Sequence, residues 1–516
     1  TFQEGNICRF SIPHNSIPFF DPHNSYLQVL MEANADTKLE LNGSSDVIIK
    51  YIRLSVNGVV LEEIDEYNQL AQLYNTYGHD ESSLEHEAVF TNNADCPNTT
   101  GLMGNQSVNV ANGQKKVKMI VPLKCLGMFS NLEIVPLVAF GNNLDVEIRF
   151  APNSEVIKTY LRDGLSQNNN TTRIPATATI ANGARMDAVP FVFTLPYKGF
   201  TSVGDVPLQV GEYVELFDTQ SPPVIIAGNG GQTIHVISAI NRVATTALTD
   251  NPNQIQLTIT QAATNGTGAG VDVGHIKLVR TTANNAVPVL TSLEYSNVEF
   301  YFQKVVPPNQ YVNSLKKQLS SPQGFQYDTH TWTTYKSSLL VGVKGQTIEI
   351  PAYQSRAKSV VCVPRIGNQT ITLALDNLMP TPQTAGKPRY EWRGQLQNLL
   401  DYQFQVNNGL RVPTRPVNLK VMNGSFLHNS AEHLIQITQA LGSSNIGVKS
   451  IKEARDNFVI GRQLSKYGGT TNLKSAMRIY LNYSADTDPA TKIQPITFIN
   501  HINRISVNSS GLQVFN

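Results

Sequence analysis

The sequence has little charge, few cysteines and no long apolar run. Charged residues make up 15% of the 516 positions, against ~25% in an average soluble domain. With 40 lysines and arginines and 39 aspartates and glutamates, the net charge is +1. A chain this neutral has no overall field that would attract phosphate. No apolar run approaches the ~20 residues that span a bilayer. These features argue against nucleic-acid-coating, disordered and membrane-spanning proteins.

Four cysteines are too few for a disulfide scaffold. Cys8, Cys96, Cys125 and Cys362 are widely spaced and form no C-x-x-C pair of the kind that binds zinc or does redox chemistry. The first ten residues also lack the pattern of a signal peptide. We therefore expect the cysteines to be reduced.

Catalytic motifs are missing as well. The glycine-rich run Gly266–Gly270 continues in strand rhythm, so no helix N-terminus follows it to hold a pyrophosphate. No G-x-S-x-G nucleophile motif occurs. The carboxylate pairs Glu62/Glu63 and Asp65/Glu66 flank a hairpin and a helix start, where they suit a helix N-terminus. We expect no enzyme, no catalytic residue and no cofactor, although a hydrolase with two carboxylates facing across a groove stays open.

One cluster of possible metal ligands stands out, formed by His79, Asp80, Glu81 and His86. It is not an H-E-x-x-H site, because the second histidine is missing. A solvated acidic loop is the favoured interpretation, and we expect no metal site. An ion at a subunit contact is the alternative.

Binding motifs are equally thin. The segment Lys387–Arg393 interleaves basic and aromatic residues, but Glu391 interrupts it, so a packed aromatic beside exposed charges is favoured over nucleic-acid stacking. Only Trp332 and Trp392 could serve as large platforms for sugars. A multi-domain β-sandwich carbohydrate-binding protein or adhesin is therefore the alternative function.

The fold class follows from the spacing of turns. Asn, Thr, Gly and Pro separate short alternating runs about every ten residues, which is typical of sandwiches and barrels. Amphipathic helices are few. We predict a mainly β fold, with clear strands at Val47–Leu54, Lys115–Val121, Leu144–Phe150, Val298–Val305 and Met477–Tyr483.

An internal repeat gives the strongest organisational signal. In the first half, Asn57-Gly58 lies between two apolar runs and predicts a tight hairpin. A helix capped by Asp65 follows and ends at Gly78, with an apolar stripe of Tyr67, Leu70, Ala71 and Tyr74.

The second half repeats this order. Alternating residues lead into Asn423-Gly424, a capping box joins Asn429 to Glu432, and Gly442 ends the helix. The predicted apolar stripe of this helix is Ala431, Leu434, Ile435 and Thr438. The repeat predicts two tandem β modules of one topology.

Domain limits follow from these elements. We predict an N-terminal arm at 1–20, a first module at 21–306 and a second module at 321–516. A linker helix joins them at 307–320, after Pro307-Pro308. A charge-poor segment rich in Gly, Thr and Val, at 193–282, is predicted as a small barrel inserted in the first module.

Three segments resemble the double jelly-roll major capsid proteins of large double-stranded DNA viruses and virophages. Ile52–Tyr77 is similar to that family's strand–turn–strand–Ile-Asp–helix segment. Met119–Leu123 with Ile134–Phe140 resembles its paired I-P-L and L-P-L-x-A run, followed by a strand at Leu144–Phe150. Asn297–Phe302 with Tyr311–Gln318 resembles the last strand of the first jelly roll and its linker helix. Within the family, virophages of the mavirus type look most similar.

The resemblance implies two tandem eight-stranded jelly rolls, with the insertion forming a tower. It implies a homotrimer that acts as a pseudo-hexameric capsomer in an icosahedral shell, next to other capsomers and to penton and minor capsid proteins. The expected location is the virion, assembled in the host cytoplasm, with no sequence-specific nucleic-acid contact and no transmembrane contact. The stretch Phe10–Phe20 is expected to staple neighbouring trimers or to touch an inner membrane peripherally.

Overall fold

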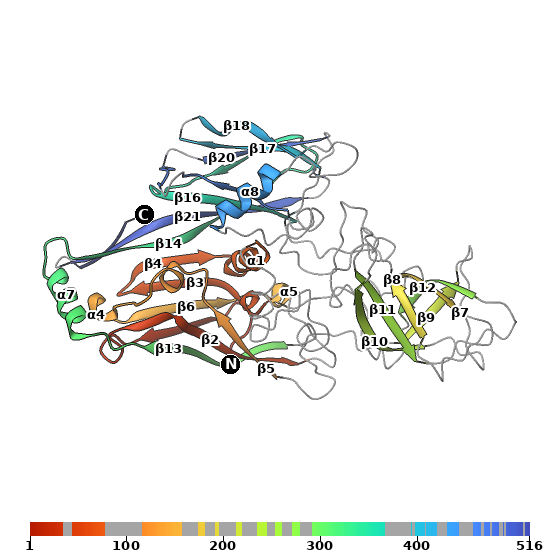
Figure 1. The fold of residues 1–516 in the computed structure, drawn as a ribbon, viewed down its shortest axis with the longest axis horizontal. Helices are drawn as coiled ribbons and strands as arrows, with labels where there is room; N and C mark the ends of the chain where they lie inside the picture. The colour runs from red at the N-terminus through yellow and green to blue at the C-terminus, as the bar shows by residue number, and fades with distance from the viewer. Residues whose placement is uncertain are drawn as a thin grey trace.

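The computed structural model describes two β-sandwiches, a small barrel and the helices between them (Figure 1). The described residues are 1–34, 44–77, 116–156, 174–180, 191–195, 213–218, 235–244, 253–260, 271–278, 292–366, 394, 398–407, 409–419, 431–442, 458–465, 469–474, 477–484, 489, 492–508 and 511–515. Statements below about missing features refer to these residues.

The second sandwich has a complete jelly-roll strand order. Numbered along the chain, its first eight strands form one sheet in the order 1-8-3-6 (β14-β21-β16-β19) and another in the order 2-7-4-5 (β15-β20-β17-β18). All pairs are antiparallel, and this arrangement is two interleaved Greek keys. The strands are β14 (Phe325–Lys336), β15 (Gly345–Ile350), β16 (Ala357–Ile366), β17 (Leu399–Val406), β18 (Leu410–Asn418), β19 (Ile460–Gln463), β20 (Met477–Tyr483), β21 (Ile493–Asn508) and the extra strand β22 (Gly511–Phe515).

The first sandwich follows the same order with one strand reduced. Its sheets are β1-β6-β3-β4 and β13-β2-β5, and the place of the first strand is held by a single bridge between Phe2 and Tyr295. The predicted mainly β fold with two tandem jelly rolls is confirmed, with seven strands rather than eight in the first. They are β1 (Ile7–Ile12), β2 (Phe20–Asn34), β3 (Ile49–Val56), β4 (Val59–Asp65), β5 (Lys116–Pro122), β6 (Leu144–Phe150) and β13 (Ser292–Lys304).

The N-terminal residues belong to the first sandwich. Strand β1 pairs along its whole length with β6, and Phe20 already starts β2. Ile12, Ile17 and Phe19 are buried within the chain. The prediction of a free arm at 1–20 is therefore wrong: the alternation of Cys8, Phe10 and Ile12 is that of a strand, and the apolar residues that follow fill this sandwich's own core.

The predicted hairpin and helix of the first half are present. Asn57 and Gly58 both have positive φ, 48° and 80°, as a two-residue hairpin turn requires. Helix α1 (Tyr67–Tyr77) follows β4. Its first intrahelical bond runs from the N–H of Leu70 to the carbonyl of Glu66, so Glu66 and not Asp65 occupies the N-cap position.

In the second half, α8 (Ala431–Ala440) lies between strands five and six, as α1 does in the first. Gly442 has the positive φ of 74° predicted for the helix end. The predicted stripe is partly wrong, because Ile435 is exposed while His433 and Ile437 are buried. His433 faces inward because its ring stacks on Phe458, 5.0 Å between centroids.

The strand before α8 belongs to a hairpin that the sequence does not predict. Strands β17 and β18 pair directly, and the chain turns between them at Asn407 and Gly409, both with positive φ. Val417 lies near the end of the second strand of this hairpin, where it pairs with Tyr402. The predicted turn at Asn423-Gly424 and the cap at Asn429 lie outside the described residues.

The insertion between β6 and β13 contains a closed six-stranded barrel, in the order β10-β11-β8-β7-β12-β9. Its strands are β7 (Ile174–Ile180), β8 (Phe191–Leu195), β9 (Tyr213–Asp218), β10 (His235–Ala244), β11 (Asn253–Thr260) and β12 (Val271–Leu278). The barrel begins earlier than the predicted limit at 193, because β7 pairs with β12 to close it. Figure 1 shows it projecting beyond one end of the sandwiches.

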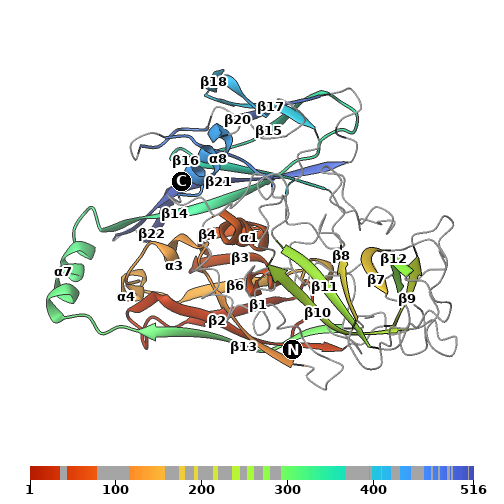
Figure 2. The ribbon, with the colours of Figure 1, turned by 45° about the vertical axis from the view of Figure 1, so that its right-hand side comes forward.

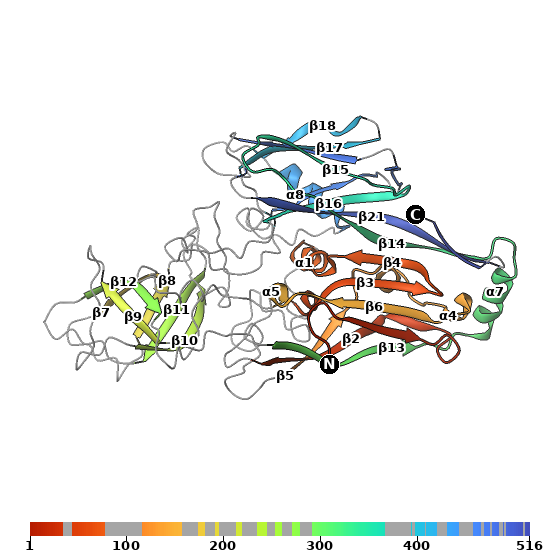
Figure 3. The ribbon, with the colours of Figure 1, turned by 180° about the vertical axis from the view of Figure 1, so that it is seen from behind.

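At the opposite end lies α7 (Asn309–Leu319), which coincides with the predicted linker helix (Figures 1 and 2). Leu315 packs with Phe19 and Ala139 beneath it. Seen from behind, α7 again joins the lower and upper sandwiches at the end away from the barrel (Figure 3). None of the helices in the described residues is long and apolar enough to cross a membrane.

Short helical turns complete the first sandwich. They are η1 (Ser45–Ile48), α3 (Gly127–Ser130), α4 (Leu137–Phe140) and α5 (Asn153–Val156). Cys8, Cys125 and Cys362 are buried and form no disulfide bond, and burial raises the pKa of the Cys362 thiol to about 12. Burial also raises the pKa of the Cys8 thiol to about 11, so Cys8 and Cys362 are packing residues that stay protonated at neutral pH.

Candidate functional site at the junction of the two sandwiches

The two sandwiches meet along a surface that we call the junction: β4, the start of α1 and α3 on one side, and the outer face of the sheet β14-β21-β16 on the other. Its apolar part belongs to the core of the first sandwich. Strand β16 shows this directly, because Val360 and Cys362 point into the second sandwich while Val361 and Val363 join the core shared with the first. A strand buried on both faces reads as an unbroken apolar run, which is how this segment reads.

Aromatic packing crosses the junction. Trp332 of β14 is buried and meets the ring of Tyr74 of α1 edge to face, 6.2 Å between centroids. Phe498 of β21 is fully buried in the same core. Such pairs stabilise by ~0.5–1.5 kcal/mol beyond their buried area. The two sandwiches therefore share one core and cannot turn freely against each other.

Strand β4 is the edge of its sheet, and the second sandwich covers that edge. The hydroxyl of Thr334 donates to the carbonyl of Asp65 at 2.6 Å. The side-chain amide of Asn503, in β21, donates to the carbonyl of Leu61 at 3.1 Å. Side chains of one sandwich thus satisfy backbone carbonyls on the free edge of the other, which also removes an edge that could pair with another chain.

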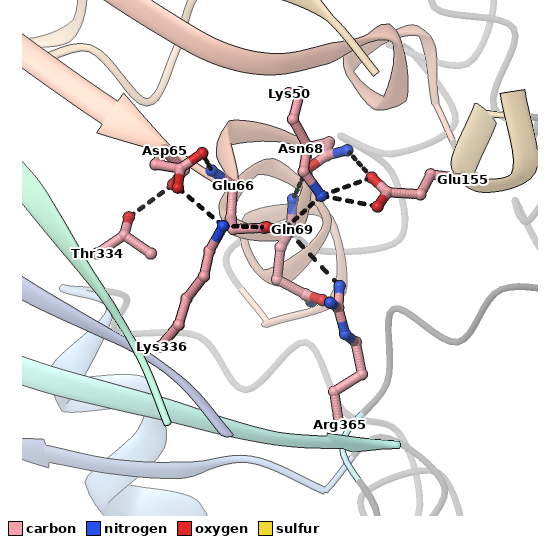
Figure 4. A network of polar contacts seen from close by, with 9 residues as sticks. All are labelled: Lys50, Asp65, Glu66, Asn68, Gln69, Glu155, Thr334, Lys336 and Arg365. Atoms are coloured by element: carbon pink, nitrogen blue, oxygen red, sulfur yellow. Dashed lines mark hydrogen bonds and ion pairs between the residues drawn. The ribbon is translucent and has the colours of Figure 1, made fainter. Parts of the chain in front are cut away.

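A network of charges closes one end of the junction (Figure 4). Glu66 lies at its centre, buried, with φ of 54° in the left-handed region. Its carboxylate oxygens lie 2.8 Å from Nζ of Lys50 and 2.8 Å from Nζ of Lys336. Nη1 of Arg365 is 3.7 Å away. Lys50 comes from the first sandwich, whereas Lys336 and Arg365 come from β14 and β16 of the second.

Two more carboxylates complete the network. Lys336 also bonds Asp65 at 2.8 Å, and Lys50 bonds both oxygens of Glu155, at 2.7 and 2.8 Å. Asn68 donates to Glu155 at 3.0 Å. Three cations thus face three carboxylates. The charges of buried Glu66 and Glu155 are balanced, while Lys336 and Asp65 lie at the partly exposed rim of the network.

The titration of Glu66 reflects this setting. Burial alone would raise its pKa, but Lys50, Arg365 and Lys336 outweigh burial and hold the pKa below its usual value. For Lys336, burial acts to lower the pKa, and Glu66 and Asp65 reverse this and raise it. The carboxylate of Glu66 and the ammonium group of Lys336 are therefore both charged near neutral pH. Removing one partner of such a buried set is costly because it leaves charge uncompensated.

A second buried carboxylate, Glu62 of β4, fixes α3 against the junction. Its two oxygens accept the backbone N–H groups of Gly127, at 2.7 Å, and Met128, at 2.5 Å. Burial raises the pKa of Glu62 to about 7, although these bonds lower it. Gly127 in turn packs on β14 so closely that a Cβ would lie 1.8 Å from the carbonyl oxygen of His330.

Comparison with known proteins gives structural matches only. No family model matches the sequence, and no curated protein matches it. The chain is similar to the capsid of the virus PBCV-1, with a TM-score of 0.48 and 10% identity, over 100% of this chain and 94% of the other. The Faustovirus major capsid protein matches with a TM-score of 0.46 and 10% identity, over 98% and 88%. The mavirus major capsid protein matches with a TM-score of 0.33 and 10% identity, over 100% and 88%.

These are capsid proteins of the kind that the sequence resembles, and mavirus is among them. The assignment of the fold itself rests on the strand order of the two sandwiches.

The candidate site residues predicted from the sequence have different outcomes in the structure. Trp332 is buried at the junction, which removes it as a sugar platform. Of the carboxylates predicted to lie at a helix N-terminus, Glu62 does accept N–H groups at one, but the helix is α3 and not α1. The described residues contain no group of three or more His, Cys, Asp or Glu that could hold a metal. The cluster from His79 to His86, the segment Lys387–Arg393, the run Gly266–Gly270 and Cys96 lie outside the described residues.

Sequence reasoning missed the junction. Lys50, Lys336, Arg365 and Glu155 lie far apart in the chain and share no motif. The one sequence feature that pointed to the network was Glu66. It lies among acidic residues at the start of a helix, and no lysine or arginine lies three or four residues away to pair with it.

Proposed function

We propose that this chain is the major capsid protein of an icosahedral double-stranded DNA virus or virophage. The observation that carries the proposal is that one chain holds two jelly rolls of the same strand order, fixed to each other by a buried junction. The segments that resemble the double jelly-roll family point the same way. The role requires no catalysis and no cofactor.

Three such chains would place six similar sandwiches around one axis. A unit with this outline can fill a hexagonal position in a closed shell, because each contact recurs under symmetry. The rigid junction matters here, since a hinge between the sandwiches would give each subunit a different outline. The near-zero net charge allows identical subunits to pack side by side without strong mutual repulsion.

The barrel inserted between β6 and β13 would then stand at one end of the capsomer, as a tower, with α7 at the other end. Neighbouring capsomers, penton proteins and minor capsid proteins are the expected partners in the virion. Assembly in the host cytoplasm, without sequence-specific contact to nucleic acid, belongs to the same proposal.

The test is expression of the chain alone, followed by light scattering and negative-stain imaging. We expect a particle of three times the 56.7-kDa chain mass, with a six-lobed outline. A protein that stays monomeric at all concentrations and salt levels, and never forms shells with coexpressed minor proteins, would contradict the proposal.

A further inference from the structure

The contact between the two sandwiches is of the head-to-tail kind. The free edge of β4, which holds the fifth strand position of the jelly-roll order in the first sandwich, lies across β14, β21 and β22 of the second. The contact uses an edge strand of the first sandwich and a sheet face of the second. The equivalent sheet face of the first sandwich and the equivalent edge strand of the second therefore make no contact of this kind within the described part of the chain. These are β18, the fifth strand of the second jelly roll, and the outer face of β13-β2-β5 in the first.

Strand β18 is exposed and basic. It ends its sheet in the order β15-β20-β17-β18, and its burial pattern is mostly exposed. Arg411 and Arg415 are both exposed, and Leu410 is 58% exposed. The guanidinium of Arg411 lies over its own sheet, 5.1 Å from the centroid of the Tyr480 ring, and donates to Gln403 at 3.2 Å, whereas Arg415 has no such contact among the described residues. Pro413 and Pro416 have no N–H, so this edge is poorly suited to extend a sheet into another chain. The edge of β18 is suited to lie across the face of another sheet, whose side chains can donate hydrogen bonds to its backbone carbonyls.

The outer face of β13-β2-β5 is polar, aromatic and acidic on its β13 side. Tyr26 and Tyr301 stack across the two strands, 5.3 Å between centroids. The carboxylate of Glu299 accepts the hydroxyl of Tyr301 at 2.7 Å and the amide of Gln28 at 3.3 Å.

Glu294 extends this acidic edge of β13, where it accepts the amide of Gln3 at 3.2 Å. Lys118 of β5 is exposed on the far side of the sheet, two strands away from β13. The face therefore offers carboxylates to a basic strand at β13, together with hydroxyl and amide donors for backbone carbonyls. Thr334 and Asn503 supply donors of the same kind to β4 at the junction.

We propose that β18 of one copy docks on the β2–β13 face of a second copy, repeating between chains the contact that β4 makes within the chain. This inference rests on the proposed capsid function and names the surfaces that would join its subunits. Both surfaces are carried by every copy, and a head-to-tail contact closes into a threefold ring when it rotates each copy by a third of a turn. Opposite charge, Arg411 and Arg415 against Glu294 and Glu299, sets the partner.

The contact between chains is more polar than the one within the chain. The outer face of β14-β21-β16 carries Trp332, Val361, Val363 and Phe498, while the β2–β13 face carries tyrosine, glutamine and glutamate. This difference fits subunits that must stay soluble before they meet, because charged and polar groups steer association without exposing a large apolar patch.

Charge reversal tests the inference. We compare the wild type with Arg411→Glu/Arg415→Glu, with Glu294→Lys/Glu299→Lys and with all four substitutions together. Lys317→Glu on exposed α7 is the matched control for a change of charge. Light scattering across a dilution series measures the assembly state, and circular dichroism verifies folding.

We expect each double variant to associate about 100-fold more weakly than the wild type, because like charges then face each other. The fourfold variant and Lys317→Glu should assemble as the wild type does. A wild type that forms trimers while both double variants remain equally trimeric would overturn the docking surfaces and leave the capsid function standing. A wild type that is monomeric throughout would overturn both.

A second measurement covers the case in which a double variant fails to fold. In a Cys96→Ser background, Thr414→Cys and Ser296→Cys place single thiols on β18 and β13, and the remaining native cysteines, Cys8, Cys125 and Cys362, are buried. Under oxidation we expect chain-to-chain disulfides only when both substitutions are present. Crosslinking that is the same in the single variants, or none in the pair despite trimer formation, would overturn the inference.

Discussion

Gly127 offers a sharp test of whether the two sandwiches are packed against each other as one body. Gly127→Ala adds one methyl group at the first residue of α3, where alanine is the better helix former by ~1 kcal/mol. Local preference alone therefore predicts a more stable protein. Packing predicts the opposite, because that methyl carbon would lie 1.8 Å from the carbonyl oxygen of His330, where real contacts stay above 3.0 Å.

The magnitude follows from what must move. To reach an allowed contact, α3 and β14 have to separate by about 1 Å. Neither side yields easily, since β14 pairs with β21 along its length and Glu62 holds the N–H groups of Gly127 and Met128. Forced overpacking typically costs ~1–3 kcal/mol. We expect a loss near the upper end of that range, about 3 kcal/mol in the free energy of unfolding.

Urea denaturation followed by tryptophan fluorescence measures this loss. The chain has two tryptophans, and Trp392→Phe leaves Trp332, buried at the junction, as the reporter. Gly345→Ala is the matched control, because nothing lies within 4 Å of its added carbon. That variant should stay within ~0.5 kcal/mol of the parent. A Gly127→Ala protein as stable as the parent, or more stable, would refute the packing argument.

The two buried carboxylates give two further predictions. Glu62 has its pKa raised from 4.5 to about 7 on folding, so the folded state binds the proton more tightly between these values and stability rises as pH falls through 7. From pH 8 to pH 5, the wild type should gain about 2–3 kcal/mol relative to Glu62→Gln, measured by denaturation at each pH; a constant difference would contradict the shift. Glu66→Gln leaves Lys50, Lys336 and Arg365 short of one negative charge and should cost about 3 kcal/mol at pH 7. The exposed pair of Glu349 with Arg478 supplies the control, Glu349→Gln, which should cost under ~0.5 kcal/mol; equal losses in the two variants would show that the network adds nothing to the junction.

Local rules explain what the sequence could predict. The strands at Leu144–Phe150 and Met477–Tyr483 and the helix Asn309–Leu319 were predicted within a residue or two, because alternation, turn residues and an early proline act over a few positions. The turn at Asn57-Gly58 belongs to the same class, since it depends on two residues that tolerate positive φ. Repetition of the strand–helix order then led to two modules of one topology.

Other features depend on partners distant in sequence. The segment Phe10–Phe20 reads as an arm because its prolines interrupt any pattern, yet Ile12 and Phe20 are buried by strands more than a hundred residues away. The hairpin of β17 and β18 turns at Asn407 and Gly409, which carry a weaker turn signal in the sequence than Asn57-Gly58 does. The junction network could not be predicted, because a charge gains its partner only after both sandwiches have formed.

The central claim is that six jelly rolls from three chains make one capsomer. A cryo-EM map of the purified oligomer tests it most directly. The account predicts six sandwiches around a threefold axis, with the rigid junction of β4 on the β14–β21 face inside each chain and the three barrels at one end. A map showing single chains, a twofold dimer or two sandwiches that vary in relative orientation would contradict it.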